Sequence, residues 1–280
     1  MIVDVYAKPG ELIQGVLPGN KRFLVSNKSS RFFKSRTEIG IGNLTKQETL
    51  NYKSQKTIEL FWSSLPDKKQ KVDISKLYFK QEGNIPVGKG LSSSSADVLG
   101  LLDALSRFYN TGYSTEQLYN LAASIEPTDP CLHTCNLLFN QDKGEITQAL
   151  SSLPYQLIYF DSDENTLVDT IALSQLINYS ESQQQEYERL CKQIICATAD
   201  NDYESFNFCL NKSAEINQFF LQKKGFHVLQ DFAIENKVGL FVAHSGTYMG
   251  LVIEPSRFKS LEAKAAEVIK KNWNTAIYTD

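Results

Sequence analysis

One loop, rich in glycine and serine, restricts most strongly what this chain can fold into. It runs from Gly83 to Asp97 with the sequence GNIPVGKGLSSSSAD and lies between a predicted strand and a predicted helix. Its three glycines permit sharp turns and close approach of the backbone to a ligand, and a helix start offers free N–H groups with a favourable dipole. Lys89 adds a positive charge, and the serine hydroxyls can donate to phosphate or bind a hard cation such as Mg²⁺. These features predict a phosphate-binding loop.

Two other interpretations of the loop stay open. A serine-rich helix cap after a turn is common, but a cap needs one serine and the run Ser92–Ser95 supplies four. The stretch from Gly83 to Lys89 also fits the P-loop pattern G-x-x-x-x-G-K. However, Gly90 stands where a P-loop has Ser or Thr, and Pro86 has no backbone N–H to donate. The P-loop is therefore the less well matched alternative.

The hydrophobic pattern predicts a mixture of strands and helices. Predicted strands are Ile2–Tyr6, Arg22–Val25, Thr57–Trp62, Lys76–Gln81, Tyr155–Phe160, Val238–Ala243, Tyr248–Ile253 and Thr275–Tyr278. Predicted helices are Ser95–Tyr109, Thr115–Ile125 with a capping box from Ser114 to Gln117, long polar helices between Glu181 and Lys224, Phe226–Asn236 and Ser256–Lys271. Strands and helices do not alternate strictly, which favours an α+β fold. The pattern restarts near residue 152, which predicts two domains, 1–152 and 153–280.

Charge and cysteine content limit the partners and the compartment. The chain has 29 Lys plus Arg against 32 Asp plus Glu, a formal net charge of −3, so nothing in the global charge favours nucleic acid or an anionic membrane. No apolar run approaches the ~20 residues that cross a bilayer, and the first residues do not resemble a signal peptide. Five cysteines without C-x-x-C spacing indicate reduced thiols and a cytoplasmic location. Cys131, His133 and Cys135 lie too close in sequence to form a good zinc cage.

The segment from Pro86 to Ala96 resembles the second motif of the GHMP kinases (galacto-, homoserine, mevalonate and phosphomevalonate kinases), P-x-x-x-G-L-G-S-S-A-A. Ser92 replaces the usual third glycine, and Ser95 replaces an alanine. Gly10 to Gly15, Glu126 to Asp129 and Ala243 to Thr247 are similar to landmarks of the L-threonine kinase branch of that superfamily. The resemblance implies a two-domain α+β fold, with an N-terminal ATP-binding domain like a ribosomal-protein fold and a ferredoxin-like C-terminal domain.

The resemblance also implies roles for individual residues. It places the phosphates of ATP on the loop formed by Pro86, Val87, Gly88, Lys89, Gly90, Leu91, Ser92, Ser93, Ser94 and Ser95, and it makes Ser94 a Mg²⁺ ligand. Glu126 is implied as a second Mg²⁺ ligand and Asp129 as the base, although the two carboxylates can exchange these roles. Glu11, Ser245, Gly246 and Thr247 are implied to contact the substrate, with Glu11 facing a substrate ammonium. A carboxylate in a turn and a plain hairpin are the alternatives for these last residues.

The predicted activity is ATP-dependent phosphorylation of L-threonine or a similar small hydroxylated amino acid or amine. A catalytically inactive nucleotide-binding regulator of the same fold is the main alternative. RNA binding is disfavoured by the charge balance and by the lack of an aromatic stacking motif. The acceptor, the pathway and the oligomeric state do not follow from the sequence.

Overall fold

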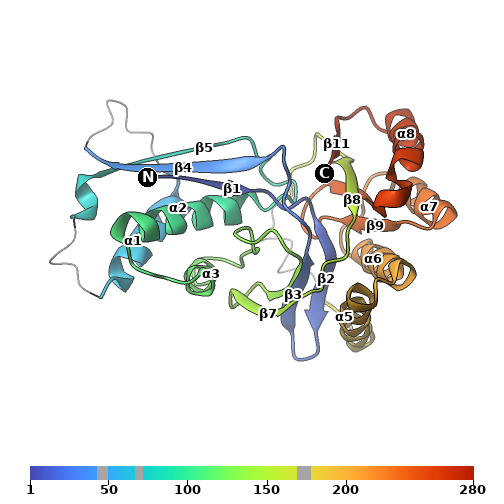
Figure 1. Cartoon of the computed structure of the whole chain (residues 1–280), viewed down its shortest axis with the longest axis horizontal. Coiled ribbons are helices and arrows are strands. Elements are labelled where there is room, and N and C mark those ends of the chain that lie inside the picture. The colour runs from blue at the N-terminus through green and yellow to red at the C-terminus, as the bar shows by residue number, and fades with distance from the viewer. Residues whose placement is uncertain (43–49, 67–71, 169–177) are drawn as a thin grey trace.

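Two antiparallel sheets organise the chain, which this computed structural model describes over residues 1–42, 50–66, 72–168 and 178–280. The small sheet has the strand order β1 (Ile2–Tyr6), β4 (Lys34–Ile41) and β5 (Leu77–Gly83). The large sheet has the order β11 (Ile277–Thr279), β8 (Gln156–Asp161), β10 (Tyr248–Ile253), β9 (Gly239–Val242), β2 (Glu11–Leu17), β3 (Lys21–Ser26), β6 (Leu137–Asn140) and β7 (Glu145–Ala149). In Figure 1 the small sheet lies along the top of one half, and the large sheet continues into the other half.

Helices cover both sheets and divide the core into clusters. The small sheet packs against α2 (Ser93–Tyr109), which in turn contacts α1 (Tyr52–Ser64) and α3 (Thr115–Ala123), and a short 3₁₀ helix, Ile74–Lys76, precedes β5. The large sheet packs against α5 (Glu181–Asp200), α6 (Tyr203–Asn217), α7 (Phe226–Asn236) and α8 (Pro255–Asn272), which gather on the right of Figure 1. The buried face of α2 includes Val98, Leu101, Leu102 and Leu105, the stripe that helical periodicity predicts.

Most predicted elements are present with small shifts in their ends. The capping box at Ser114 and Gln117 forms as predicted, and the helix Phe226–Asn236 has the predicted bounds. The strand predicted at Thr57–Trp62 is wrong, because these residues lie inside α1. Isoleucine, phenylalanine and tryptophan favour strands in general, but here the core-facing side of a helix buries them. The strands β2, β4, β6 and β7 were not among the predicted elements.

The large sheet joins strands from both sides of the predicted boundary near residue 152. β2 comes from the first part and β9 from the second, and they meet through the pair Glu11↔Val242. This single registered pair lies next to the residues expected to contact the substrate. The division into 1–152 and 153–280 remains a prediction.

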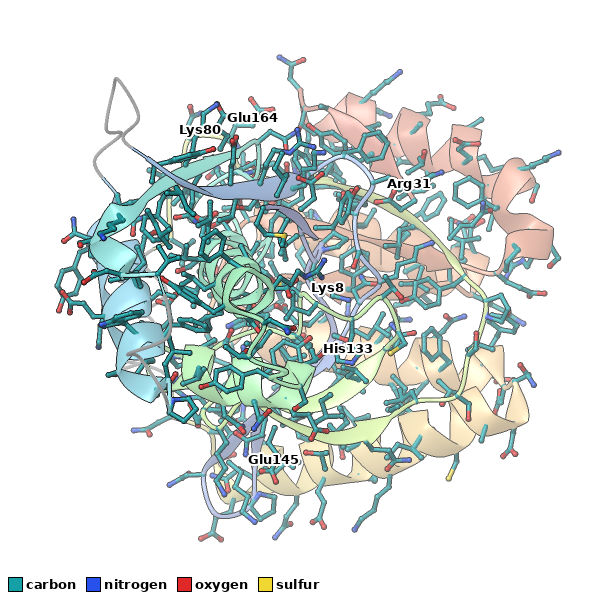
Figure 2. The ribbon with its side chains drawn as sticks, turned by 60° about the vertical axis from the view of Figure 1, so that its left-hand side comes forward. Lys8, Arg31, Lys80, His133, Glu145 and Glu164 are labelled. Atoms are coloured by element: carbon teal, nitrogen blue, oxygen red, sulfur yellow. The ribbon has the colours of Figure 1, made fainter. Side chains whose placement is uncertain are left out.

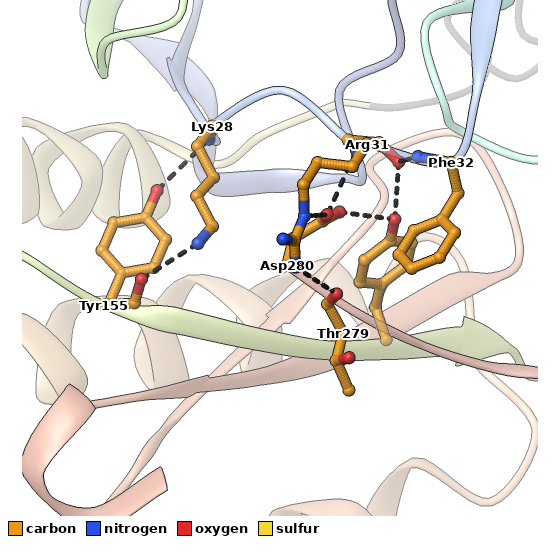
Figure 3. A network of polar contacts seen from close by, with 8 residues as sticks. Lys28, Arg31, Phe32, Tyr155, Thr279 and Asp280 are labelled. Atoms are coloured by element: carbon orange, nitrogen blue, oxygen red, sulfur yellow. Dashed lines mark hydrogen bonds and ion pairs between the residues drawn. The ribbon is translucent and has the colours of Figure 1, made fainter.

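A polar network fastens the segment after β3 to the end of the chain (Figure 3). The side chain of Asp280 accepts hydrogen bonds from the backbone N–H of Arg31 at 3.1 Å, from its Nε at 2.9 Å and from Tyr159 Oη at 2.8 Å. Lys28 Nζ donates to the carbonyl of Tyr155 at 3.0 Å. These bonds hold the connection from β3 to β4 against β8 and β11. None of the helices in the described ranges is long and apolar enough to span a bilayer.

Candidate active site

A pocket of about 350 Å³ lies where the glycine- and serine-rich loop meets the start of α2. Of the predicted site residues, those that line it are Glu11, Gly88, Gly90, Leu91, Ser92, Ser93, Ser94, Ser95, Glu126, Asp129 and Ser245. The pocket therefore brings together segments more than 200 residues apart in the sequence. Pro86, Val87, Lys89, Gly246 and Thr247 are not part of its wall.

The backbone carbonyls of the loop accept hydrogen bonds from other parts of the fold. The carbonyl of Gly88 accepts from Val168 N at 3.1 Å, that of Lys89 from Thr247 N at 3.2 Å, and that of Gly90 from Gly10 N at 3.4 Å. Within the described ranges, no N–H from Gly88 to Ser95 has a hydrogen-bond partner. A row of free N–H groups that ends in a helix N-terminus is well suited to bind phosphate oxygens.

Left-handed backbone conformations shape this loop. Gly88 and Gly90 have φ values of 70° and 79°, and Ser92 has a φ of 60°. Ser92 occupies the position of the third glycine in the GHMP kinase motif, so the structure explains why glycine suits that position. A Cβ on Gly90 would lie 2.2 Å from Ala243 Cβ, which shows how closely the loop approaches the turn after β9.

Ser94 and Glu126, the two predicted metal ligands, are in direct contact. Ser94 Oγ donates a hydrogen bond to Glu126 Oε1. Lys53, from the first turn of α1, joins them, with Nζ 2.8 Å from Ser94 Oγ and 2.6 Å from Glu126 Oε2. A hydroxyl and a carboxylate are the hard oxygen donors that Mg²⁺ prefers, and the ammonium shows that a cation fits between them. The donor set therefore suits Mg²⁺.

Asp129 is buried and held in place by two polar neighbours. Its backbone N–H donates to Ser95 Oγ at 3.0 Å, and its Oδ1 accepts from Gln141 Nε2 at 2.8 Å. Burial raises the pKa of Asp129, and the negative charge of Glu11 raises it further. A carboxylate with a raised pKa accepts a proton more readily than an exposed aspartate does. The geometry and the pKa both suit a base.

Glu11 is paired with His244 instead of pointing freely into the pocket. Glu11 Oε2 accepts from the backbone N–H of His244 at 2.9 Å, and Oε1 lies 3.0 Å from His244 Nδ1. Burial alone lowers the pKa of His244, but the attraction of Glu11 outweighs it, so the net pKa is raised. Lys223 is buried nearby, and its Nζ has no hydrogen-bond partner in the described part of the chain. Burial lowers the pKa of Lys223 to about 7.

The side chain of Lys89 is directed away from the pocket. It is 6% exposed, pairs with Asp161 Oδ2 at 2.9 Å and donates to the carbonyl of Asp163 at 2.8 Å. Its proposed contact with phosphate would require breaking this buried ion pair. A P-loop needs its lysine on the phosphates, so this geometry disfavours the P-loop alternative.

Gly246 and Thr247 support the loop from behind. A Cβ on Gly246 would lie 2.0 Å from the carbonyl carbon of Lys89, so only glycine fits at this contact. Pro86 lies before the part of the loop that reaches the pocket, and Val87 is 75% exposed. The structure thus places the predicted substrate contacts Gly246 and Thr247 against the loop backbone.

Sequence reasoning missed several polar residues around the site. Lys53 was not predicted, because the incorrect strand at Thr57–Trp62 stood in place of the helix that carries it. The helix had a signal: Ile58, Phe61, Trp62 and Leu65 have the spacing of a helical face. Gln141 gave no signal. Lys8 is buried, donates to the carbonyls of Asn27 and His133 at 2.8 and 2.6 Å, and is attracted by Asp129.

Figure 2 shows Lys8 and His133 close together near the centre of the molecule. His133 is bonded to Tyr119 through Nδ1 at 2.8 Å. All five cysteines are free, and no group of three or more His, Cys, Asp or Glu residues in the described ranges has the geometry of a metal site. The loop's hydroxyls and Glu126 therefore remain the candidate metal donors.

Comparison with known proteins defines the class of fold. Residues 55–134 match the family described as GHMP kinases N terminal domain. The chain is similar to mevalonate kinase from Methanococcus jannaschii, with a TM-score of 0.71 and 15% identity over 100% of this chain and 97% of that one. At this identity the likeness shows a shared fold.

Two curated relatives are also similar in sequence. L-threonine kinase from Citrobacter freundii is 26% identical over 260 residues, covering 90% of this chain and 85% of that protein. L-threonine kinase from Salmonella typhimurium is 27% identical over 212 residues, or 68% of this chain and 65% of that protein. The resemblance indicated by the motifs is thus confirmed: residues 55–134 match the GHMP kinase N-terminal domain, and the chain has the two-domain α+β fold of the GHMP kinases.

Proposed function

We propose that this protein transfers a phosphoryl group from ATP to the side-chain hydroxyl of L-threonine or a similar small hydroxylated amino acid or amine. One observation carries the proposal: a single pocket is lined by a loop with free N–H groups, by the Ser94 and Glu126 pair and by the buried carboxylate of Asp129. Phosphoryl transfer needs these three elements, because it depends on positioning, on charge neutralisation and on a group that orients the attacking hydroxyl.

The loop and the start of α2 form the nucleotide side of the pocket. Free N–H groups from Gly88 to Ser95 would bind phosphate oxygens, and the helix dipole of α2 would favour their negative charge. Ser94 and Glu126 would hold Mg²⁺, which neutralises charge on the phosphates when it is bound. Lys89 contributes here as an anchor of the loop through Asp161.

Asp129 and Glu11 form the acceptor side. Asp129 would accept the proton of the attacking hydroxyl, and Ser95 and Gln141 fix its position for that role. Glu11 would contact the substrate ammonium. Each of its oxygens already accepts one hydrogen bond from His244, and a carboxylate oxygen can accept a second. Ser245 adds a hydroxyl on the same side.

The relatives support an amino-acid acceptor. Both curated relatives are named L-threonine kinases, and a third, 29% identical over 136 residues, is a homoserine kinase from Buchnera aphidicola. Threonine and homoserine share an α-amino group, an α-carboxylate and a side-chain hydroxyl. A cytoplasmic location remains a prediction from the cysteine content.

The test is an ADP-release assay with Mg²⁺ and four acceptors: L-threonine, L-serine, homoserine and ethanolamine. We expect turnover with at least one of them and most with L-threonine. Folded protein that binds ATP but turns over none of the four would refute the proposal and favour the non-catalytic regulator. Ethanolamine lacks the carboxylate, so its rate relative to L-serine shows whether the enzyme recognises that group.

A further inference from the structure

Lys53 reaches into the proposed metal site from a different element. Its ammonium bridges the two residues assigned to the metal, with Nζ 2.8 Å from Ser94 Oγ and 2.6 Å from Glu126 Oε2. The side chain of Glu126 is 15% exposed, whereas that of Lys53 is 41% exposed. The lysine thus enters from the solvent side and ends on the oxygens that would bind a metal.

Lys53 is the ion-pair partner of Glu126 in this pocket. Asp97 of α2 accepts a hydrogen bond from Ser35 Oγ at 2.6 Å, so its carboxylate is bonded on another side. Without Lys53 or a metal, Glu126 would lose the cation that neutralises it, which is unfavourable for a largely buried carboxylate.

We propose that Lys53 is a built-in counter-cation that occupies the metal position and is displaced when a divalent metal enters with the nucleotide. The inference rests on the proposed function, since that assigns Ser94 and Glu126 to the metal. The ammonium and the metal need the same two oxygens and repel one another, so both cannot bind there together. When no metal is bound, Lys53 keeps Ser94 and Glu126 together, and it lowers the affinity for the metal.

The geometry allows this exchange without unfolding α1. The lysine stem is flexible and partly exposed, so its ammonium can move into solvent. The body of α1 is fixed independently: Phe61 is fully buried, and Ser54 Oγ donates to Gln81 Oε1 at 2.6 Å. Only the side chain of Lys53 has to move.

The experiment measures binding of Mn²⁺ in the presence of a non-hydrolysable ATP analogue, from the electron paramagnetic resonance signal of free Mn²⁺. We compare the wild type with Lys53→Met, with Lys53→Arg, which keeps the charge, and with Lys56→Met, a matched change at an exposed lysine of α1. We expect Lys53→Met to bind Mn²⁺ about three- to tenfold more tightly. We expect Lys56→Met and Lys53→Arg to match the wild type.

Unchanged or weaker binding of Mn²⁺ by Lys53→Met would overturn the inference, because Lys53 would then not compete with the metal. Ser94→Ala should weaken binding in both the wild-type and the Lys53→Met background. If it does not, the metal is bound elsewhere and the inference is also wrong.

The ADP-release assay is scored separately. Tighter Mn²⁺ binding without turnover on any acceptor would support the exchange and refute the kinase. Turnover together with unchanged Mn²⁺ affinity in Lys53→Met would support the kinase and refute the exchange.

Discussion

Asp129→Asn should reduce activity severely while leaving the fold intact or more stable. Asparagine has nearly the same shape, so its backbone N–H can still donate to Ser95 and its side-chain oxygen can still accept from Gln141. The nucleotide side of the pocket is unaffected, and ATP affinity should stay close to that of the wild type. What the variant loses is the capacity to accept a proton.

The size of the loss follows from that single change. Removal of a general base usually costs about 10²- to 10⁴-fold in rate, which corresponds to about 3–5 kcal/mol of transition-state stabilisation. Burial raises the pKa of Asp129, so its ionised form is disfavoured in the folded protein. The stability of the wild type therefore falls as the pH rises from the ordinary aspartate pKa through this raised pKa, and the Asp129→Asn variant avoids that loss. The stability advantage of the variant should grow from pH 4 towards neutral pH.

Three measurements check the prediction: steady-state kinetics, nucleotide affinity by calorimetry, and urea denaturation at several pH values. Asp103→Asn is the matched control, because Asp103 pairs with Arg107 on the surface of α2 and is not part of the pocket wall. It should leave the rate unchanged. If Asp129→Asn kept more than a tenth of the wild-type rate, Asp129 would not be the base. If it lost rate only in proportion to a loss of stability, the residue would be structural.

Three further changes test the support of the site. Ser95→Ala leaves the buried N–H of Asp129 without an acceptor and should cost about 1–2 kcal/mol in urea denaturation and roughly tenfold in kcat; wild-type values of both would contradict the positioning role. Gly246→Ala places a Cβ 2.0 Å from the carbonyl carbon of Lys89, so we expect a loss of about 2–3 kcal/mol and weaker nucleotide binding by calorimetry; normal nucleotide affinity would show that the loop does not depend on this contact. Lys223→Met removes a buried ammonium whose pKa is about 7, so it should be more stable than the wild type by on the order of 5 kcal/mol at pH 6. Because the wild-type protein gains stability between about pH 7 and the ordinary lysine pKa of 10.5, this advantage should shrink as the pH rises, and a constant difference across that range would contradict the assignment.

Much of the fold could be predicted because its signals are local. The stripe on α2, the capping box of α3 and the bounds of α7 depend on neighbouring residues in the sequence, and each is present as predicted. The strand predicted at Thr57–Trp62 failed because strand-forming residues also suit a helix that packs them into a core. The intrinsic preference of a residue for a strand contributes less free energy than the burial of its side chain in a core.

The glycine- and serine-rich loop could be predicted only in part. Glycine and serine content identified the loop, and the free N–H groups are where it predicted them. The direction of Lys89 was not predictable, since it depends on Asp161 at the end of β8, 72 residues away by its number. Lys53 was missed for the same reason, because its partners lie on α2 and after α3.

The sequence alone predicted an α+β fold and marked the glycine- and serine-rich loop, because both depend on short-range spacing and on the small residues that a close backbone approach requires. The carboxylates near the loop were predicted through the family resemblance of the motifs. The tertiary structure decided which side chains share the pocket and what each one binds. Glu11 is tied to His244, which is 233 positions away, and Asp129 to Ser95 in the loop. Such pairings follow from how sheets and helices pack together, and residue spacing along the chain carries no record of them.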